Sequence, residues 1–150
     1  MRRVFIAAMA AAGLLACGEK PSTMEDLTST TVTFPNGTRI IAQAMRERID
    51  LTRGMMFRDS LAADHGMLFF HGRMGRYTYW TYQTRIPLDF IWMDRDHRIV
   101  EMAVNIPPCP SKAAHECPNY GGNQDASYVL EVNAGIATKN GLKVGDRLDF

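Results

Sequence analysis

The chain has 150 residues, and its 17 basic and 16 acidic residues leave a formal net charge of +1. This length suits one domain. The basic residues are balanced by acidic ones and form no clustered basic face, so the composition excludes a nucleic-acid-binding protein and predicts no nucleic-acid partner.

The N-terminus predicts a bacterial lipoprotein signal peptide. Two arginines precede an apolar stretch, residues 4–12, which is too short to span a bilayer. Residues 14–17 then read Leu-Leu-Ala-Cys. Small residues before a cysteine favour lipidation and cleavage over a plain secretory cut or a cytoplasmic helix. We therefore expect residues 1–16 to be removed and Cys17 to become an acylated N-terminus, carrying palmitate or similar chains.

This anchor predicts a protein that faces the periplasm and contacts the membrane through its lipid. Residues 17–29 contain few apolar side chains, which is typical of a flexible tether between lipid and domain. In a Gram-negative cell, Gly18 after the cysteine favours the outer membrane. Loss of the two N-terminal arginines leaves 15 basic and 16 acidic residues, so the mature net charge is near −1.

The first predicted elements of the domain, which we place at residues 30–150, form a hairpin. Residues 31–34 and 38–42 are rich in β-favouring side chains, and the turn between them contains Asn-Gly, a strong hairpin signal. Residues 46–57 lack a β pattern and predict a short helix or helical turn. Asp59 is expected to cap a second turn that extends through Ala63.

The remainder reads as short strands with one more helix. The predicted strands are residues 66–70, 77–82, 88–93, 98–104, 128–132 and 147–150. Residues 134–140 predict two helical turns, which Gly141 can end in a left-handed conformation. Many short strands with few helices predict a mainly β fold, a compact single-domain sandwich or barrel.

The three cysteines divide into the lipidation site and one pair. Cys109 and Cys117 lie in a proline-rich loop, and in an oxidising envelope they predict a disulfide. The alternative is a metal or redox pair, but their spacing matches neither Cys-x-x-Cys nor a common zinc site.

Six segments share their order with a known family. They read RGMMFR (residues 53–58), GMLF (66–69), YW (79–80) with Thr84, IPLD (86–89), YVLEVNAG (128–135) and GDR (145–147). Together they cover nearly the whole mature domain and resemble the bacterial and archaeal domain of unknown function family 192. The resemblance implies a compact β fold with jelly-roll-like character and implies no activity, because the role of that family is not established.

Two features distinguish this chain among the members of the family that it resembles. The family usually has lysine where this chain has Tyr82, so a lysine base or nucleophile is not available here. The cysteine pair, together with Tyr-Gly-Gly at residues 120–122, looks like a periplasmic branch of the family.

Charges embedded in these apolar segments form the candidate site. Arg53 and Arg58 flank two methionines, while Asp89 and Glu131 each lie between apolar residues of a predicted strand. Such charges need a partner, so we expect these four residues to lie near one another. The set is either a polar cleft for a ligand or a group of structural ion pairs. With its aromatic and hydroxyl neighbours it comprises Arg53, Arg58, Trp80, Thr84, Asp89 and Glu131.

Two other groups of side chains have structural and functional interpretations. Tyrosines and tryptophans could stack on a sugar or peptide, but we expect Trp80 and Trp92 to lie in the core. A stretch with several methionines and two histidines could bind copper(I). We expect its methionines to fill the core instead. The residues of this stretch are Met45, Met55, Met56, His65, Met67, His71 and Met74.

The sequence names no reaction. It lacks the Gly-x-Ser-x-Gly elbow, the Walker loop, the dinucleotide fingerprint and the zinc-protease motif, so we expect no catalytic residue, cofactor or metal. The favoured hypothesis is a lipid-anchored periplasmic module that binds an envelope ligand or protein without transforming it. The alternatives are an envelope hydrolase with an Asp/Glu/Arg cleft and a Met/His copper-binding protein.

Overall fold

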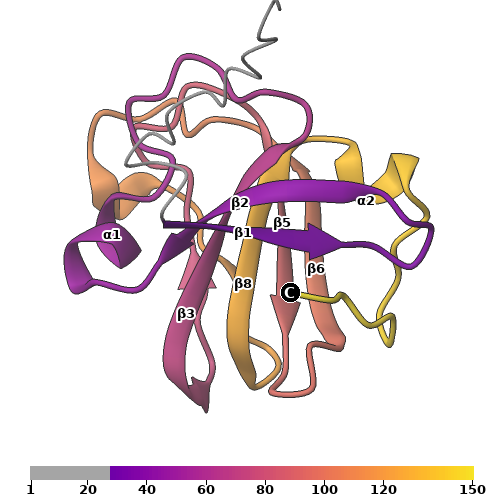
Figure 1. Cartoon of the computed structure of the whole chain (residues 1–150). Helices are drawn as coiled ribbons and strands as arrows, with labels where there is room; N and C mark the ends of the chain where they lie inside the picture. The colour runs from indigo at the N-terminus through magenta and orange to yellow at the C-terminus, as the bar shows by residue number, and fades with distance from the viewer. Residues whose placement is uncertain (1–27) are drawn as a thin grey trace, which may run out of the picture.

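The computed structural model describes residues 28–150, which form a mainly β fold with two short helices (Figure 1). The predicted signal peptide, Cys17 and most of the tether lie outside the described residues. The elements are β1 (Ser29–Thr33), β2 (Arg39–Met45), α1 (Arg48–Arg53), β3 (His65–Gly75), β4 (Thr78–Tyr79), β5 (Leu88–Met93), β6 (Ile99–Ile106), a 3-10 turn (Ala114–Glu116), β7 (Tyr120–Gly121), β8 (Ala126–Asn133) and α2 (Ile136–Lys139).

Six strands form one mixed sheet in the order β1-β2-β3-β8-β5-β6. The hairpin of β1 and β2 is confirmed, with Gly37 at a positive φ of 86° in its turn. The pairing of β2 with β3 is parallel, and the other pairs in this sheet are antiparallel. The chain makes this parallel pair by crossing from β2 to β3 through α1, so the predicted helix at 46–57 is confirmed in a shorter form.

The sheet curls so that β1 and β2 pass in front of β8, β5 and β6 (Figure 1). Apolar side chains from both layers meet in a first core, in which Val32 and Ile40 of the front layer share a cluster with Ile91 and Leu130. The mainly β expectation is therefore confirmed, and the sheet is not closed into a barrel.

The opposite face of the sheet carries a second core. Because side chains alternate along a strand, Val129 of β8 points to this face while Leu130 points to the first core. Val129 packs here with Phe69 of β3 and with Phe90 and Trp92 of β5. The segments that cover this second core build the candidate site described below.

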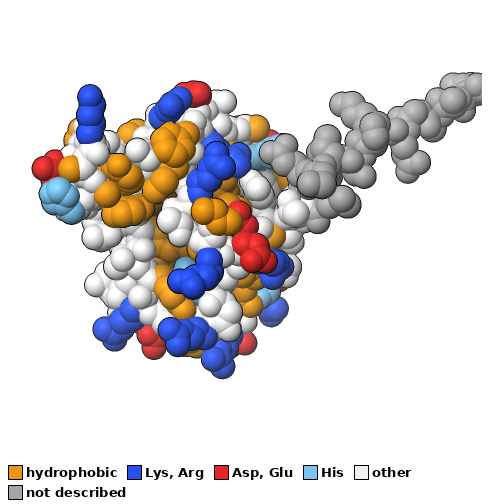
Figure 2. Space-filling view, turned by 90° about the vertical axis from the view of Figure 1, so that its left-hand side faces the viewer, with side chains coloured by type: hydrophobic (Ala, Val, Ile, Leu, Met, Phe, Trp, Pro, Cys, Tyr) orange, Lys and Arg blue, Asp and Glu red, His pale blue; other side chains and the backbone are white. Residues whose placement is uncertain are grey.

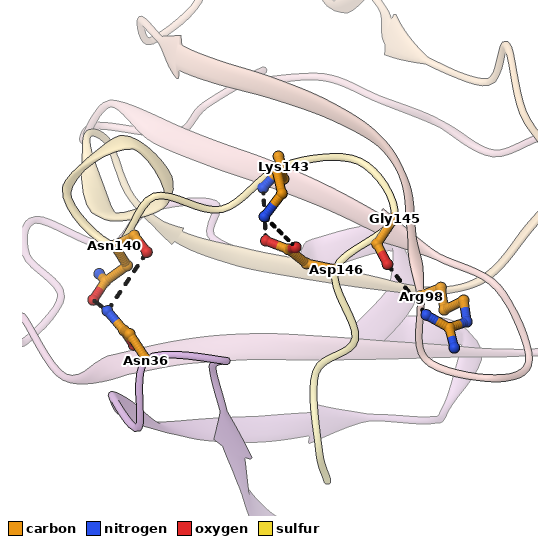
Figure 3. A network of polar contacts seen from close by, with 6 residues as sticks. All are labelled: Asn36, Arg98, Asn140, Lys143, Gly145 and Asp146. Atoms are coloured by element: carbon orange, nitrogen blue, oxygen red, sulfur yellow. Dashed lines mark hydrogen bonds and ion pairs between the residues drawn. The ribbon is translucent and has the colours of Figure 1, made fainter.

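The C-terminal segment holds the curled sheet in shape. Residues 147–150 were expected to form a strand, but they make only isolated bridges, Thr33 with Asp149 and Arg98 with Arg147. Nearby polar contacts fix the same region (Figure 3): the Asn36 side chain donates a hydrogen bond to Asn140, and Lys143 pairs with Asp146 at 2.8 Å.

The predicted strand at 77–82 shortens to β4, which pairs with β7 in a two-stranded sheet. Gly121 of β7 lies against the Trp92 indole, where a Cβ would come within 2.1 Å of a ring carbon. Trp92 also donates a hydrogen bond from its indole nitrogen to the Tyr77 carbonyl at 2.8 Å. This small sheet is thereby fixed on the second core.

Two further expectations have clear outcomes. The Cys109–Cys117 disulfide is confirmed. The second helical turn from Asp59 is wrong, because Asp59 instead forms an exposed ion pair with Arg85 at 2.6 Å. No helix within residues 28–150 is long and apolar enough to cross a membrane.

Candidate functional site

A pocket of about 130 Å³ opens over the second core. Four parts of the chain line it: α1 with the turn after it, β3, the segment from Tyr77 to Thr84, and β8. The lining residues are Leu51, Thr52, Arg53, Gly54, Met55, Met56, Phe69, His71, Tyr77, Thr78, Tyr79, Trp80, Tyr82, Thr84 and Glu131. Glu131 is the only carboxylate among them.

Glu131 occupies a position that the sheet would ordinarily fill with an apolar side chain. It lies on the central strand β8, directly between Met67 of β3 and Phe90 of β5. Its side chain is 4% exposed, and its Oε2 atom is buried with no hydrogen-bond partner among the described residues. A buried polar atom without a partner costs about 1–3 kcal/mol, so this position is unfavourable for folding alone.

The environment of Glu131 favours the neutral acid. Burial raises the pKa of Glu131 to about 8, while the charge of Arg58 acts to lower it. At pH 7 the side chain is therefore mainly a carboxylic acid, which can donate one hydrogen bond and accept others.

The backbone of Gly54 lies directly over this carboxyl group. A Cβ on Gly54 would approach the Phe69 ring to 3.2 Å and Glu131 Oε2 to 3.7 Å, and the residue has a positive φ of 43°. Glycine is the residue that meets both demands, because it has no Cβ and tolerates this φ. The turn after α1 can therefore close over Glu131.

The two predicted arginines differ in their roles. Arg58 donates a hydrogen bond to the Gln43 side chain at 2.8 Å and influences Glu131 by its charge. Arg53 is exposed, lines the pocket and forms no ion pair among the described residues. It is thus available to a ligand that enters the pocket.

A neutral pair of side chains, His71 and Tyr79, forms one wall. Burial lowers the pKa of His71 to about 4. Burial, with smaller effects from Glu131 and Tyr77, raises the pKa of Tyr79. Both groups are uncharged at pH 7, and His71 Nε2 and the Tyr79 hydroxyl share a hydrogen bond of 2.9 Å. The Tyr77 ring stacks on His71 with centroids 3.5 Å apart.

Trp80 and Tyr82 form the outer wall. Their ring centroids lie 5.6 Å apart, and Trp80 is 37% exposed, so the expectation of a buried Trp80 is wrong while that of a buried Trp92 is confirmed. Thr78 is exposed and Tyr79 packs on the second core, so the alternation of side chains turns Trp80 outward. Trp80 therefore offers an aromatic face at the pocket rim.

The disulfide loop supports this outer wall. The Thr81 hydroxyl donates to the Pro107 carbonyl at 2.9 Å, and the Cys109 amide donates to the Thr81 carbonyl at 3.2 Å. The Tyr82 hydroxyl donates to the Lys112 carbonyl at 3.3 Å. The loop closed by Cys117 thus holds the aromatic rim in place.

Asp89 does not belong to the site, which corrects the expectation of one four-residue cluster. Its neighbour Phe90 is the residue opposite Glu131, so Asp89 points to the other face of the sheet. There it is fully buried and accepts hydrogen bonds from the backbone amides of Asn105 at 2.7 Å, Gly135 at 3.1 Å and Ala137 at 2.8 Å. Asp89 anchors the start of α2 and has no arginine partner within residues 28–150.

The methionines of the copper-binding hypothesis are divided between the core and the surface. Met45, Met55 and Met67 are buried in the second core, whereas Met74 is 40% exposed. Within residues 28–150 no group of three histidine, cysteine, aspartate or glutamate side chains is placed to hold a metal.

The sequence identified Arg53, Trp80, Thr84 and Glu131 as candidates, all of which line the pocket, but gave no sign of the neutral wall. His71 and Tyr77 meet because residues 71–74 form a bulge in β3. The bulge lies between two cross-strand pairs, Phe70 with Tyr128 and Gly75 with Ala126. The only signal for this bulge was the pair of glycines at 72 and 75. What the assembled pocket can do is hydrogen-bond and stack on a small polar molecule.

Residues 31–150 match the family model of DUF192, described as Uncharacterized ACR. No curated protein matches the chain. Among solved structures, a protein described as a "putative transcription regulator" from Sinorhizobium meliloti 1021 is 29% identical, with a TM-score of 0.69 over 79% of this chain and 89% of that one. A protein of unknown function from Novosphingobium aromaticivorans DSM 12444 is 30% identical, with a TM-score of 0.68 over 81% of this chain and 84% of that one.

Proposed function

The chain belongs to the DUF192 family of uncharacterised proteins, and from that premise we propose that it is a small-molecule-binding module of the cell envelope. In this proposal a lipid on Cys17 holds the domain at a membrane surface, and the pocket over Glu131 takes the ligand without transforming it.

The unpaired carboxyl group of Glu131 carries this proposal. A protein that needed this position only for packing would fill it with an apolar side chain, as it does at Met67 and Phe90 on either side. The buried oxygen instead faces a pocket, where a ligand can supply the missing hydrogen bond. Binding would then recover the free energy that the unpaired Glu131 oxygen costs.

The surrounding charges disfavour a cationic ligand, and the protonated Glu131 and the exposed Trp80 ring suit a neutral one. Arg58 lies near enough to act on Glu131, and Arg53 lines the same pocket, so an organic cation would meet two positive charges. A neutral ligand with hydroxyl groups can accept a hydrogen bond from the protonated Glu131 side chain and donate another to it. Its apolar face can rest on the exposed ring of Trp80. A sugar ring is the simplest compound with these features.

A hydrolase is the weaker interpretation, because the pocket holds one carboxyl group. Glycoside hydrolysis typically uses two carboxyl groups that flank the scissile bond. The second predicted carboxylate, Asp89, is on the opposite face of the sheet and fully bonded to backbone amides. Transcriptional regulation, the role named for the Sinorhizobium relative, gains no support from the balanced charge of this chain.

The envelope location rests on the sequence around Cys17 and on the disulfide. Disulfides persist in oxidising compartments such as the periplasm and are rare in the cytosol. The Cys109–Cys117 bond supports the pocket rim, so the proposed site benefits from that compartment.

The test is a titration of the purified protein at pH 7 with glucose and N-acetylglucosamine, and with butylamine as a cationic probe. We expect a neutral sugar to bind, and Glu131→Ala to weaken that binding about 5–150-fold, which corresponds to the loss of a buried hydrogen bond of about 1–3 kcal/mol. Glu47→Gln, at an exposed glutamate outside the pocket, is the matched control and should bind as the wild type does. Binding of butylamine alone, or equal affinities for the two variants, would refute the proposal.

A further inference from the structure

A second hollow, independent of the pocket over Glu131, lies where β3 bulges away from β8. Phe70 pairs with Tyr128 and the next pair is Gly75 with Ala126, so four residues of β3 face Ser127 alone. The ladder opens at this point and leaves a hollow of about 540 Å³. Its lining residues are Arg46, Phe70, Gly72, Arg73, Arg95, Ser127 and Tyr128.

Three arginines and no carboxylate line this hollow. Arg46 comes from the end of β2, Arg73 from the bulge and Arg95 from the β5–β6 turn, so distant parts of the chain converge on it. None of the three belongs to an ion pair among residues 28–150. Figure 2 shows basic side chains, in blue, gathered at the lower end of the molecule, where Figure 1 places the β5–β6 turn.

Two details make this hollow more than a charged surface. The Arg46 guanidinium lies 3.6 Å from the centre of the Phe70 ring, which fixes its position and leaves its edges free to donate. Ser127 is 7% exposed, and its hydroxyl oxygen is buried without a hydrogen-bond partner among the described residues. A bound group with acceptor oxygens could accept hydrogen bonds from both the Arg46 guanidinium and the Ser127 hydroxyl.

We propose that the hollow between β3, β8 and the β5–β6 turn binds the phosphate group of an anionic ligand. Phosphate has the acceptor oxygens and the negative charge that several guanidinium groups and a hydroxyl recognise together. This site goes beyond the proposed sugar pocket, because it shares none of that pocket's lining residues.

A phospholipid headgroup is the source of phosphate that the chain geometry favours. Arg46 also lines a neighbouring hollow that includes Thr28, the first described residue. The ten residues between Cys17 and Thr28 can span at most about 35 Å. An anchored domain could therefore bring this hollow to the bilayer surface, where each arginine near anionic lipid contributes to binding.

The test compares vesicles of phosphatidylcholine with vesicles that also contain phosphatidylglycerol, using the full chain with Cys17→Ser so that no acyl anchor is attached. The difference in binding between the two compositions isolates the headgroup, because any apolar contribution of the N-terminus is equal in both. We expect Arg73→Gln and Arg95→Gln each to reduce this difference roughly fivefold. Arg39→Gln removes the same charge from the far end of β2 and should change it less than about twofold.

Ser127→Ala adds a readout that separates binding from folding. It removes a buried unpaired hydroxyl, so stability should stay equal or rise while phosphate binding weakens. Soluble glycerol phosphate and a short DNA duplex complete the experiment. Arginine-dependent binding of vesicles identifies a headgroup, and arginine-dependent binding of glycerol phosphate alone identifies a free phosphate; either supports the site. Equal effects of Arg39→Gln and Arg73→Gln, binding of DNA alone, or no binding would overturn it.

Discussion

Replacing Asp89 by alanine tests the structural role that the sheet register assigns to this residue. The carboxylate accepts hydrogen bonds from three backbone amides, those of Asn105, Gly135 and Ala137. Hydrogen bonds to a charged group contribute about 1.5–3 kcal/mol each, but water can reach the amides of Asn105 and Gly135 because Asn105 is exposed and Gly135 is only partly buried. We therefore expect Asp89→Ala to lower the free energy of unfolding by about 3–5 kcal/mol.

Thermal and urea unfolding provide the assay. For a domain of this size, 3–5 kcal/mol corresponds to a fall in Tm of about 12–20 °C. Asp89→Asn should cost less, about 1.5–3 kcal/mol, because it keeps the oxygen that serves Asn105 and Gly135 and loses the acceptor of the Ala137 amide. Asp96→Ala, at an exposed aspartate, is the control and should cost under about 1 kcal/mol. Equal effects of Asp89→Ala and Asp96→Ala would refute the structural role.

Three further predictions concern the pocket carboxyl, the disulfide and the anchor. Burial raises the pKa of Glu131 from 4.5 to about 8, so between these pH values the folded state holds a proton that the unfolded state releases. The free energy of unfolding should therefore fall by up to about 1.4 kcal/mol per pH unit from pH 4.5 to 8, relative to that of Glu131→Gln. The same pH dependence of urea unfolding in both proteins would contradict this prediction. Replacing Cys109 and Cys117 by alanine should lower stability by about 2.5 kcal/mol and weaken sugar binding, whereas unchanged unfolding midpoints would show that the loop adds nothing. Cys17→Ser should remove the acyl mass and leave an uncleaved or soluble protein, and unchanged detergent partitioning together with an unchanged mass would exclude lipidation at this residue.

Local pattern was enough to predict most strands of this fold. The Asn-Gly turn located the first hairpin, and the apolar run at residues 88–93 has the same bounds as β5. These signals are local because they depend on alternation and turn chemistry within a few residues. The parallel pairing of β2 with β3 was not predictable in this way, since it depends on contacts between strands that a helix separates.

The arrangement of the candidate site could not be predicted from the sequence. Asp89 and Glu131 carry the same signal, a carboxylate between apolar residues, but the register that places Phe90 opposite Glu131 sends them to opposite faces. A shift of one residue would exchange these faces, and no pattern within either strand fixes that register. The neutral wall of His71 and Tyr79 depends on a bulge in β3, for which the sequence offered only two glycines.

The central claim, that Glu131 recognises a neutral ligand as a protonated acid, is tested most directly by the affinity for N-acetylglucosamine between pH 6 and 10. Because the acid must donate its hydrogen bond, affinity in the wild type should stay constant below pH 7 and fall about tenfold per unit above pH 8. Glu131→Gln keeps a donor and an acceptor that do not titrate, so its affinity should be independent of pH. Affinity that rises above pH 8 in the wild type, or the same pH profile in both proteins, would contradict this account.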